Sequence, residues 1–288
     1  MKQLAGRVAV ITGAASGIGR ATARHLARER CRLALSDLNL EGLAQLQNEL
    51  QQQGVEVMVA SVDVANAEAV EAFAMQVFQR FGQVDIVINN AGVAYTDPVE
   101  KADLQNMHWL MNINFWGVVH GCRAFLPYLR QRPDASLVNI SSIFAMVSYP
   151  TQAIYNASKA AVRGFSDALR VELRDSNVLL TCVHPGGVKT NIVRNARIGD
   201  LSRVADNALD YANDFEAIAG STPEQAAAAI VGAIQSRKPR LLIGADARLM
   251  DILYRLWPSR VAFWLDNLNQ LARRWLQKRR ARLANATR

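Results

Sequence analysis

The sequence predicts an α/β fold: a doubly wound parallel sheet in a three-layer, single-domain arrangement. Short apolar, β-branched segments alternate with helical segments, as expected for a parallel sheet covered by helices on both faces. A glycine-rich turn at 12–19 follows the first of these segments and precedes a helix. The 288 residues suit one large α/β domain, and no repeat, low-complexity stretch or Pro/Gly-rich linker divides them.

Seven short segments are predicted strands of this sheet. They lie at 7–11, 32–36, 55–59, 84–88, 136–140, 178–183 and 240–243. Such apolar runs are typical of strands that are buried on both faces. Helices are predicted over 38–53, 101–129 and 155–175. We expect residues 1–245 to form the dinucleotide-binding and catalytic domain and 246–288 to form a C-terminal helical extension.

The glycine turn predicts a binding site for a pyrophosphate, as in Rossmann-type folds. Gly13, Gly17 and Gly19 stand where a strand must turn sharply into a helix, and glycine lets the backbone approach an anion closely. The helix that follows presents free N–H groups and a partial positive charge. Ser16 and Ile18 belong to the same turn.

Acidic and small residues at the ends of the next strands predict the rest of a dinucleotide site. Asp37 ends the second strand, where a carboxylate can accept hydrogen bonds from both adenosine ribose hydroxyls. No Arg or Lys at Ser36 or Leu38 offsets its charge against a 2′-phosphate, which favours NAD(H) and leaves NADP(H) as the alternative. Asp37 can also act as a turn or helix-cap residue.

The loops after the third and fourth predicted strands also suit a dinucleotide. Asp63, followed by Val64, can bind the adenine amino group, and the small residues of Asn89–Gly92 allow the backbone to lie against the cofactor. For Asn90, a structural brace between strand ends is the equal alternative to a direct contact.

Ser142, Tyr155 and Lys159 form the candidate catalytic set. Tyr155 and Lys159 are one helical turn apart, so both side chains project from one helix face. An ammonium beside a phenol favours the phenolate and lowers the tyrosine pKa from its usual value of about 10. Tyr155 is therefore a candidate general acid/base, and Ser142 a candidate for holding the reacting oxygen. The alternative is a packed Tyr and a surface Lys on an amphipathic helix.

With these segments in order, the chain resembles the short-chain dehydrogenase/reductase family, in its single-domain branch with a Tyr-x-x-x-Lys active site. The resemblance covers about residues 5–245. The segments that carry it are TGAASGIG at 12–19, Asp37, Asp63-Val64, NNAG at 89–92, INFWG at 113–117, the Ser142, Tyr155 and Lys159 set, and PGGVKT at 185–190.

The resemblance implies a role for each matching residue. Asn114 matches the residue that bends its helix and holds a water of the proton relay, Ser142 polarises the substrate oxygen, and Tyr155 is the acid/base. Lys159 binds the nicotinamide ribose and lowers the tyrosine pKa. The predicted cofactor contacts are Gly13, Ser16, Gly17, Ile18, Gly19, Asp37, Leu38, Asp63, Val64, Asn90, Ala91, Gly92, Tyr155, Lys159, Pro185, Gly186, Val188 and Thr190.

These roles imply an oxidoreductase that interconverts a secondary alcohol and a ketone, or an aldehyde, with NAD(P). The rival hypothesis is a catalytically silent nucleotide-sensing or interaction protein on the same fold, because a fold alone does not imply activity. The intact set of Asn114, Ser142, Tyr155 and Lys159 favours the enzyme. A homodimer or homotetramer is expected through the helices at 101–129 and 155–175, as is common in this family.

By analogy with the family, residues 191–221 form a lid over the substrate. This segment is rich in apolar residues, and near Ser142 the side chain of Phe144 is bulky and Ala145 stands where a glycine is common in the family. We therefore expect a lipophilic alcohol or carbonyl substrate. The apolar residues are Ile192, Val193, Ile198, Leu201, Val204, Leu209, Tyr211 and Phe215, with Met146 and Tyr149 nearby. Arg194, Arg197 and Arg203 leave an anionic group as the alternative, although such arginines are commonly solvated.

The net charge of +8 lies entirely in the C-terminal segment. Residues 240–288 carry eleven Arg/Lys and three Asp, and the remaining 22 basic and 22 acidic residues balance. Apolar residues recur there at helical intervals, and Pro258 is expected to separate two helices. They are Val261, Trp264, Leu265, Leu268, Leu271 and Trp275. This helix either packs on the core or on a second subunit, or lies on a membrane surface. No nucleic-acid-reading motif accompanies the charge, so no nucleic acid is expected.

Cysteine and histidine positions bear on location and metal binding. Cys31, Cys122 and Cys182 are scattered without metal-ligand spacing, which suits a reducing cytoplasm and no metal site. The four histidines are likewise scattered and are expected to be structural or on the surface. We see no signal peptide and no apolar run near the length of about 18 residues that a membrane span needs. The expected location is cytoplasmic, and peripheral contact at a membrane through 246–288 is left open as the alternative to packing of this segment.

Overall fold

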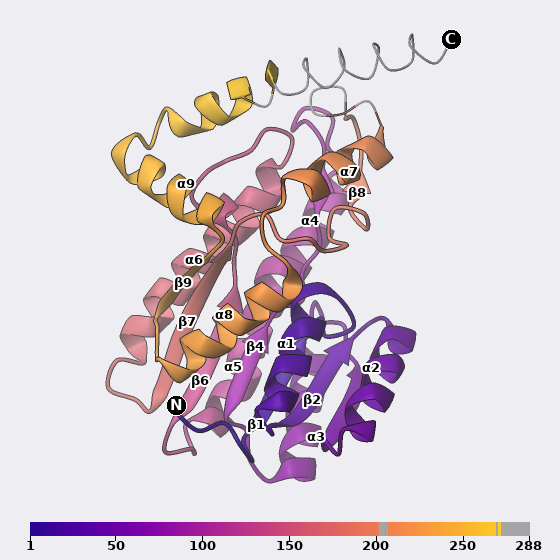
Figure 1. The fold of residues 1–288 in the computed structure, drawn as a ribbon, viewed down its shortest axis with the longest axis vertical. Helices are drawn as coiled ribbons and strands as arrows, with labels where there is room; N and C mark the ends of the chain where they lie inside the picture. Colours follow the sequence, from indigo (N-terminus) through magenta and orange to yellow (C-terminus); the bar gives the residue numbers. More distant parts are fainter. Residues whose placement is uncertain (202–204, 206, 269, 272–288) are drawn as a thin grey trace.

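A computed structural model shows the parallel sheet that the sequence predicts, with all seven predicted strands present (Figure 1). It describes residues 1–201, 205, 207–268 and 270–271. The strand order is β3-β2-β1-β4-β6-β7-β9, and every pair is parallel. The strands are β1 (Val8–Thr12), β2 (Arg32–Asp37), β3 (Val57–Ser61), β4 (Ile86–Asn89), β6 (Ala135–Ile140), β7 (Val178–Pro185) and β9 (Arg240–Ile243).

Helices cover both faces of the sheet, which gives the three layers of a Rossmann-type fold. They are α1 (Gly17–Arg28), α2 (Leu40–Gln52), α3 (Ala67–Phe81), α4 (Leu104–Met111), α5 (Gly117–Leu129), α6 (Ala153–Glu172), α7 (Ala208–Ile218), α8 (Pro223–Gln235) and α9 (Ala245–Leu256). Side chains of α1, α2 and α8 fill one core, and those of α3, α5 and α6 fill the other.

Strand β1 shows why a continuous apolar run is required at the centre of this sheet. Ala9 and Ile11 pack into the α1/α2/α8 core, whereas Val8 and Val10 pack into the α3/α5/α6 core. Successive strand side chains point to opposite faces, so a strand that is covered on both sides needs apolar residues at every position.

Most helices begin with a side chain that satisfies a free backbone N–H group. Asn39, Asn66 and Asp103 accept such hydrogen bonds at the starts of α2, α3 and α4. Thr222 and Gln225 form a capping box at the start of α8. The cap residues of α1, α5, α6 and α9 make no side-chain hydrogen bond.

Two features interrupt the elements expected from the sequence. The predicted helix over 101–129 is divided into α4 and α5 by one π-helical turn, η1 (Asn112–Trp116). A two-residue pairing of β5 (Tyr95–Thr96) with β8 (Arg197–Ile198) joins segments about a hundred residues apart. This pairing ties the segment after β7 to the loop after β4.

The C-terminal extension contains two helices separated at Pro258, as predicted. Helix α9 ends at Leu256, and residues 261–268 are helical. Val261 and Leu265 pack against Ile143 and Met146 in a small cluster beside β9, so this part of the predicted amphipathic helix packs on the chain's own core. The side chains of Trp264, Leu268 and Leu271 are exposed, and Trp275 lies outside the described residues.

Candidate active site

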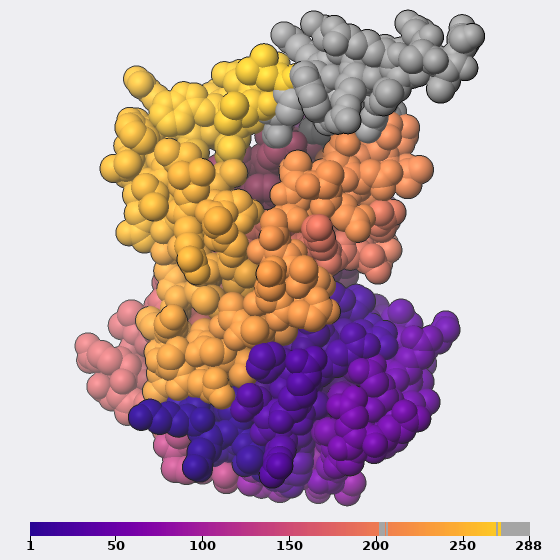
Figure 2. Space-filling view, viewed as in Figure 1, coloured from indigo at the N-terminus to yellow at the C-terminus, as the bar shows by residue number. Residues whose placement is uncertain are grey.

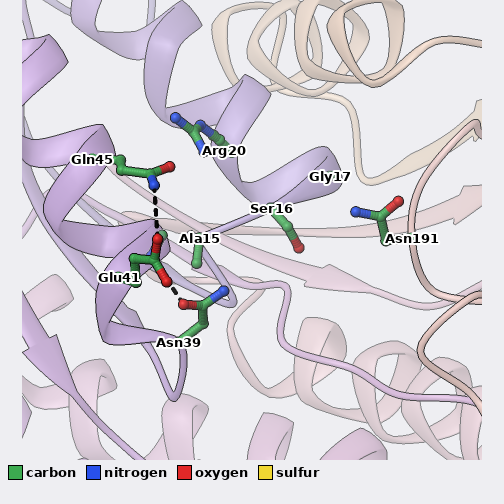
Figure 3. A pocket seen from close by; sticks show the side chains of 9 residues that line it. Ala15, Ser16, Gly17, Arg20, Asn39, Glu41, Gln45 and Asn191 are labelled. Carbon is green, nitrogen blue, oxygen red and sulfur yellow. Dashed lines mark hydrogen bonds between the residues drawn. The ribbon is translucent and has the colours of Figure 1, made fainter.

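The predicted site residues gather at the carboxyl edge of the sheet. A cleft of about 410 Å³ lies between the starts of α1 and α2, with Asn191 on its other side (Figure 3). It is lined by Ala15, Ser16, Gly17, Arg20, Asn39, Glu41, Gly42, Gln45 and Asn191. In open α/β sheets, ligands bind in crevices at this edge. Sequence reasoning included Ser16 and Gly17 but missed Arg20, Gln45 and Asn191.

The glycine turn has the backbone that close approach to an anion requires. Gly13 and Gly17 have φ of 67° and 52°, in the left-handed region. A Cβ atom at Gly13 would lie 2.8 Å from Ala91 Cα, and one at Gly17 would lie 3.2 Å from the Thr190 side chain. The first turn of α1 contains no acidic residue and its cap residue makes no side-chain hydrogen bond, so its N–H groups suit a bound pyrophosphate.

Asp37 lies at the end of β2 and faces the turn between β1 and α1. Its Oδ2 accepts a hydrogen bond from Ala15 N at 2.9 Å, and its Oδ1 accepts one from Asn39 N at 3.0 Å. The cap of α2 is Asn39, not Asp37. Each carboxylate oxygen keeps a further lone pair, so Asp37 can still accept hydrogen bonds from ribose hydroxyls.

The asparagines after β4 are braces between strand ends. Asn90 Nδ2 donates to Thr12 O at 2.9 Å and to Gly13 O at 3.0 Å, which holds the glycine turn against β4. Asn89 Nδ2 donates to Asn139 Oδ1 at 2.9 Å across to β6. The bracing interpretation of Asn90 therefore has direct support, and its side chain acts on the site through the turn.

Ser142, Tyr155 and Lys159 come together beyond the ends of β6 and β7. Ser142 is buried at the start of a 3-10 turn, η2 (Ile143–Ala145), where its Oγ accepts a hydrogen bond from Phe144 N at 3.1 Å, and its hydroxyl acts to lower the pKa of the Tyr155 phenol. Lys159 is 3 % exposed, and its Nζ lies 5.8 Å from the centre of the Tyr155 ring. The Lys159 ammonium donates to Ile140 O at 3.1 Å. The structure thus brings together all three predicted residues.

The expected lowering of the tyrosine pKa is wrong for the protein without a bound cofactor. Burial raises the pKa of Tyr155 to about 12, and the hydrogen bond with Ser142 opposes this shift. Burial also lowers the pKa of Lys159 to about 8. The Lys159 ammonium donates its hydrogen bond to the Ile140 carbonyl, and burial disfavours its charged form. Lys159 therefore stabilises a Tyr155 phenolate only weakly, and the Tyr155 phenol keeps its proton at neutral pH.

Asn114 lies in the π-helical turn between α4 and α5 and is fully buried. Its Oδ1 accepts from Val93 N at 2.8 Å, and its Nδ2 donates to Val93 O at 3.0 Å and to Ser158 Oγ at 3.3 Å. A Cβ at Gly92 would lie 3.3 Å from Asn114 Oδ1 and 3.5 Å from Lys159 Nζ. Asn114 therefore links the loop after β4 to α6 and lies near Lys159.

The loop after β7 is held by a residue that sequence reasoning missed. Asp246, in the first turn of α9, accepts a hydrogen bond from Gly187 N at 2.6 Å. The same loop carries Pro185, Gly186, Val188 and Thr190, and Thr190 lies over Gly17 of the glycine turn. Asp246 is about 60 residues from this loop in the chain, so no local pattern could have identified it.

Three other predicted cofactor residues, Asp63, Val64 and Leu38, do not line this cleft. The Asp63 carboxylate accepts from Ala65 N at 2.9 Å in a tight turn, and Val64 is buried against Gly117. The Leu38 side chain is 62 % exposed beside Asp37. Asp63 thus stabilises the turn of its own loop, and Val64 packs that loop against Gly117.

The lid segment forms a small core of its own. Val193, Tyr211 and Ala212 are buried and contact Ile192, Ile198, Leu201 and Phe215. Leu209 is exposed, and Val204 lies outside the described residues. Tyr211 Oη accepts from Gln152 Nε2 at 2.5 Å, which fastens the lid to the loop before α6. Because these apolar side chains pack against one another within the lid, they are weaker evidence for a lipophilic substrate than the sequence alone suggested.

The lid arginines have partners of their own. Arg194 pairs with Glu216 at 2.6 Å, and the guanidinium of Arg197 lies 3.7 Å above the centre of the Trp109 ring. Arg203 lies outside the described residues. This pairing disfavours Arg194 and Arg197 as binding groups for an anionic substrate.

A second groove, of about 910 Å³, lies between the loop after Ser142 and the C-terminal extension. Phe144 and Tyr149 line one side, and Ala262, Phe263 and Asp266 line the other. The Phe144 ring stacks on Tyr149 at 5.7 Å and meets the Tyr155 ring edge to face at 6.4 Å. Phe144 therefore separates this groove from Tyr155.

The described residues contain neither a candidate metal site nor a candidate membrane-spanning helix. No group of three or more His, Cys, Asp or Glu side chains in the ranges that the structure covers could hold a metal ion. Within the same ranges, no helix has the length and apolar character to cross a membrane.

Comparison with known proteins agrees with this geometry. The sequence profile of the short chain dehydrogenase family matches residues 7–200. SadH of Mycobacterium tuberculosis, which is named as an oxidoreductase, is 43% identical over 262 residues, covering 90% of this chain and 94% of that protein. Dehydrogenase/reductase SDR family member 7B of Xenopus tropicalis is 34% identical over 264 residues, covering 89% of this chain and 83% of that protein.

Solved structures give the same answer. A short-chain dehydrogenase/reductase from Burkholderia phymatum in complex with NAD has a TM-score of 0.80 and 30% identity, covering 89% of this chain and 96% of that one. An alcohol dehydrogenase from Thermococcus sibiricus complexed with 5-hydroxy-NADP has a TM-score of 0.69 and 30% identity, covering 82% and 95% of the two chains. From its sequence, its fold and its Ser-Tyr-Lys site, the chain belongs to the short-chain dehydrogenase/reductase family of oxidoreductases.

Proposed function

We propose that this protein interconverts a lipophilic secondary alcohol and the corresponding ketone, or an alcohol and an aldehyde, with NAD(H) as the favoured cofactor. The observation that carries the proposal is the convergence of Ser142, Tyr155 and Lys159 in one buried corner, with Asn114 beside them. A silent nucleotide-binding protein has no chemical need for this arrangement.

The proton chemistry follows from the state of Tyr155. Because its pKa is about 12, the phenol is protonated at neutral pH and can donate its proton to a carbonyl oxygen that the Ser142 hydroxyl holds. In the reverse direction the phenolate takes the alcohol proton, and the Lys159 ammonium lowers the free energy of that anion. When bound, the nicotinamide cofactor supplies the hydride acceptor or donor.

The preference for NAD(H) rests on Asp37. Its carboxylate suits ribose hydroxyls and repels a 2′-phosphate. Arg20 lines the same cleft, but its guanidinium lies 3.6 Å from the Glu49 carboxylate, which neutralises part of its charge. The related NAD-bound and NADP-analogue-bound structures leave both cofactors as candidates for this chain. The remaining cofactor contacts that we propose are those of the glycine turn and of the loops at 63–64, 90–92 and 185–190.

The lipophilic substrate is supported by the groove that reaches Phe144. Aromatic and alanine side chains form much of its lining, as in sites that bind apolar ligands. For assembly, we propose a homodimer or homotetramer through α4, α5 and α6, where Leu104, Trp116 and Val171 expose large apolar side chains. We also propose that 1–245 forms the catalytic domain, that 246–288 is an extension, and that the protein lies peripherally at a membrane.

The replacement Tyr155→Phe tests the reaction. We expect it to lower kcat by about a thousandfold or more, because it removes the proposed proton donor and acceptor, while cofactor binding is retained. Binding is followed by nicotinamide fluorescence with NADH and with NADPH. Tyr128→Phe, whose ring stacks on Phe78 away from the site, is the matched control. Wild-type turnover in Tyr155→Phe would refute the mechanism, and tighter binding of NADPH would refute the preference for NADH.

A further inference from the structure

Exposed apolar side chains are concentrated in the C-terminal extension. Seventeen large apolar side chains are exposed in the described part of the chain, and eight of them lie between residues 249 and 271. They are Leu249, Ile252, Leu256, Trp257, Phe263, Trp264, Leu268 and Leu271. We call this set the C-terminal apolar face. Apolar side chains scattered singly need no explanation, but such a concentration indicates a surface that contacts something.

The geometry of the two helices explains why these residues remain exposed. On α9, Leu249, Ile252 and Leu256 recur at intervals of three and four residues and therefore share one side of the helix. The opposite side of α9 carries Ala247 and Met250, which pack on the cluster beside β9. The Trp257 and Trp264 rings, 5.5 Å apart, then join α9 to the helix at 261–268.

The apolar face is also at one end of the molecule. Figure 2 shows α9 and the following helix as a ridge at the end opposite the N-terminal α/β layers, and Figure 1 places the lid helix α7 at this same end. A flat surface, such as that of a bilayer, that approaches this end of the molecule would contact the extension before the sheet.

The charge of the adjoining sequence identifies what the face meets. Residues 272–288 carry seven Arg or Lys and no Asp or Glu. Apolar side chains that include tryptophan, followed directly by a basic segment, match a bilayer whose surface carries anionic lipid. Each basic residue near such a surface contributes about 1 kcal/mol to binding in general.

We propose that the C-terminal apolar face docks on an anionic lipid bilayer, with Trp257 and Trp264 at the headgroup level. This inference rests on the proposed peripheral location and gives it a surface, an orientation and a lipid charge. A second copy of the chain fits less well. Each copy carries a net charge of +8 in residues 240–288, and like charges repel.

Docking in this orientation gives the second groove a role. Phe263 is 72 % exposed, belongs to the apolar face and lines the groove. At the other end of the groove Phe144 contacts the Tyr155 ring. A lipophilic substrate dissolved in the bilayer would then enter the groove beside Phe263 and meet the Phe144 ring before Tyr155.

Vesicle flotation of the full-length protein tests the proposal. The probes are vesicles of phosphatidylcholine alone and of phosphatidylcholine mixed with phosphatidylglycerol. The variants are Phe263→Asp and Leu268→Asp, both exposed, so neither change opens a core. The matched control is Met75→Asp, which adds the same charge to an exposed apolar position on α3. Circular dichroism of each variant confirms that it is folded.

We expect the wild type and Met75→Asp to float with the mixed vesicles, and each variant of the face to lose about tenfold in partition coefficient. Binding to phosphatidylcholine alone should be weaker by about tenfold or more, and brominated lipid should quench the wild-type tryptophan fluorescence. Equal flotation of Phe263→Asp, Leu268→Asp and wild type overturns the proposal, as does equal binding to both vesicle types. A dimer that dissociates in these variants, without vesicle binding, identifies a second copy as the partner instead.

These outcomes are separate from those of the proposed reaction. Loss of vesicle binding with intact NADH or NADPH binding and turnover refutes only the docking surface. Flotation without cofactor binding refutes the reaction and leaves the docking surface standing.

Discussion

At Lys159, the positive charge that the proposed reaction needs lowers the stability of the folded protein. The Lys159 ammonium is buried, with the Ile140 carbonyl as a close acceptor at 3.1 Å, and burial lowers its pKa from 10.5 to about 8. The proposed reaction needs the charged form beside Tyr155, whereas burial in the folded protein favours the neutral form. The site thus keeps a charge that weakens the fold.

The variant Lys159→Met should reveal this conflict through pH. Between about pH 8 and 10.5 the unfolded chain holds the lysine proton and the folded chain does not, so the stability of the wild type gains with rising pH relative to the variant. For each pH, we subtract the unfolding free energy of the wild type from that of the variant. We expect this difference to fall by about 3 kcal/mol from pH 7 to 10.5. Denaturant unfolding at several pH values measures this difference. A difference that is constant with pH would show that Lys159 has an ordinary pKa in the fold.

At the scale of elements, close packing of α5 on β4 sets the position of the π-helical turn and Asn114. Gly121 of α5 lies directly over the Asn89 side chain, and a Cβ there would overlap the Asn89 Oδ1 atom. Asn89 also braces β4 to β6 through Asn139. The small side chain at Gly121 therefore permits both the helix–sheet contact and the brace.

We expect Gly121→Ala to destabilise the protein by about 1–3 kcal/mol, because the added methyl must displace α5 or break the brace. Gly232→Ala in α8, where a Cβ would meet no atom within 4 Å, is the control and should be neutral or stabilising by up to about 1 kcal/mol. Thermal unfolding of both variants makes the comparison. Equal stability of the two would show that α5 moves at no cost.

The elements that the sequence predicted well are those with a strong local pattern. All seven strands of the main sheet follow from apolar runs, and Pro258 marked the break after α9. The β5–β8 pairing was not predictable, since each strand has two residues and their separation is about a hundred. The π-helical turn was missed because its sequence continues the helical pattern of α4 into α5.

At the scale of the whole molecule, the site combines parts that the sequence separates widely. The Ser142, Tyr155 and Lys159 set was predictable because spacing and side-chain chemistry identify it locally. The raised pKa of Tyr155 was not, because it depends on burial by elements brought from elsewhere. Asp246 and the Gln152–Tyr211 contact were missed for the same reason.

The extension should be an integral part of the catalytic unit. A chain ending at residue 245 loses Asp246, Asp251 and Val261, and so exposes the cluster beneath the Ser142 loop and frees the Gly187 loop. We expect its melting temperature to fall by roughly 10 °C and its cofactor affinity to drop. A chain ending at residue 271 keeps these contacts and should match the full-length protein in both measurements. Equal behaviour of the two truncated chains would show that α9 is dispensable.

The hydrogen bond from Gly187 N to Asp246 couples the extension to the 185–190 loop, one of the proposed cofactor contacts. Any ligand that shifts the start of α9 must move the backbone of this loop or break that bond. Binding at the two places is then linked, and thermodynamic reciprocity makes the effect of each on the other equal. Through this bond, a surface held by the extension would change the affinity for nicotinamide, and nicotinamide would change the hold on that surface by the same factor.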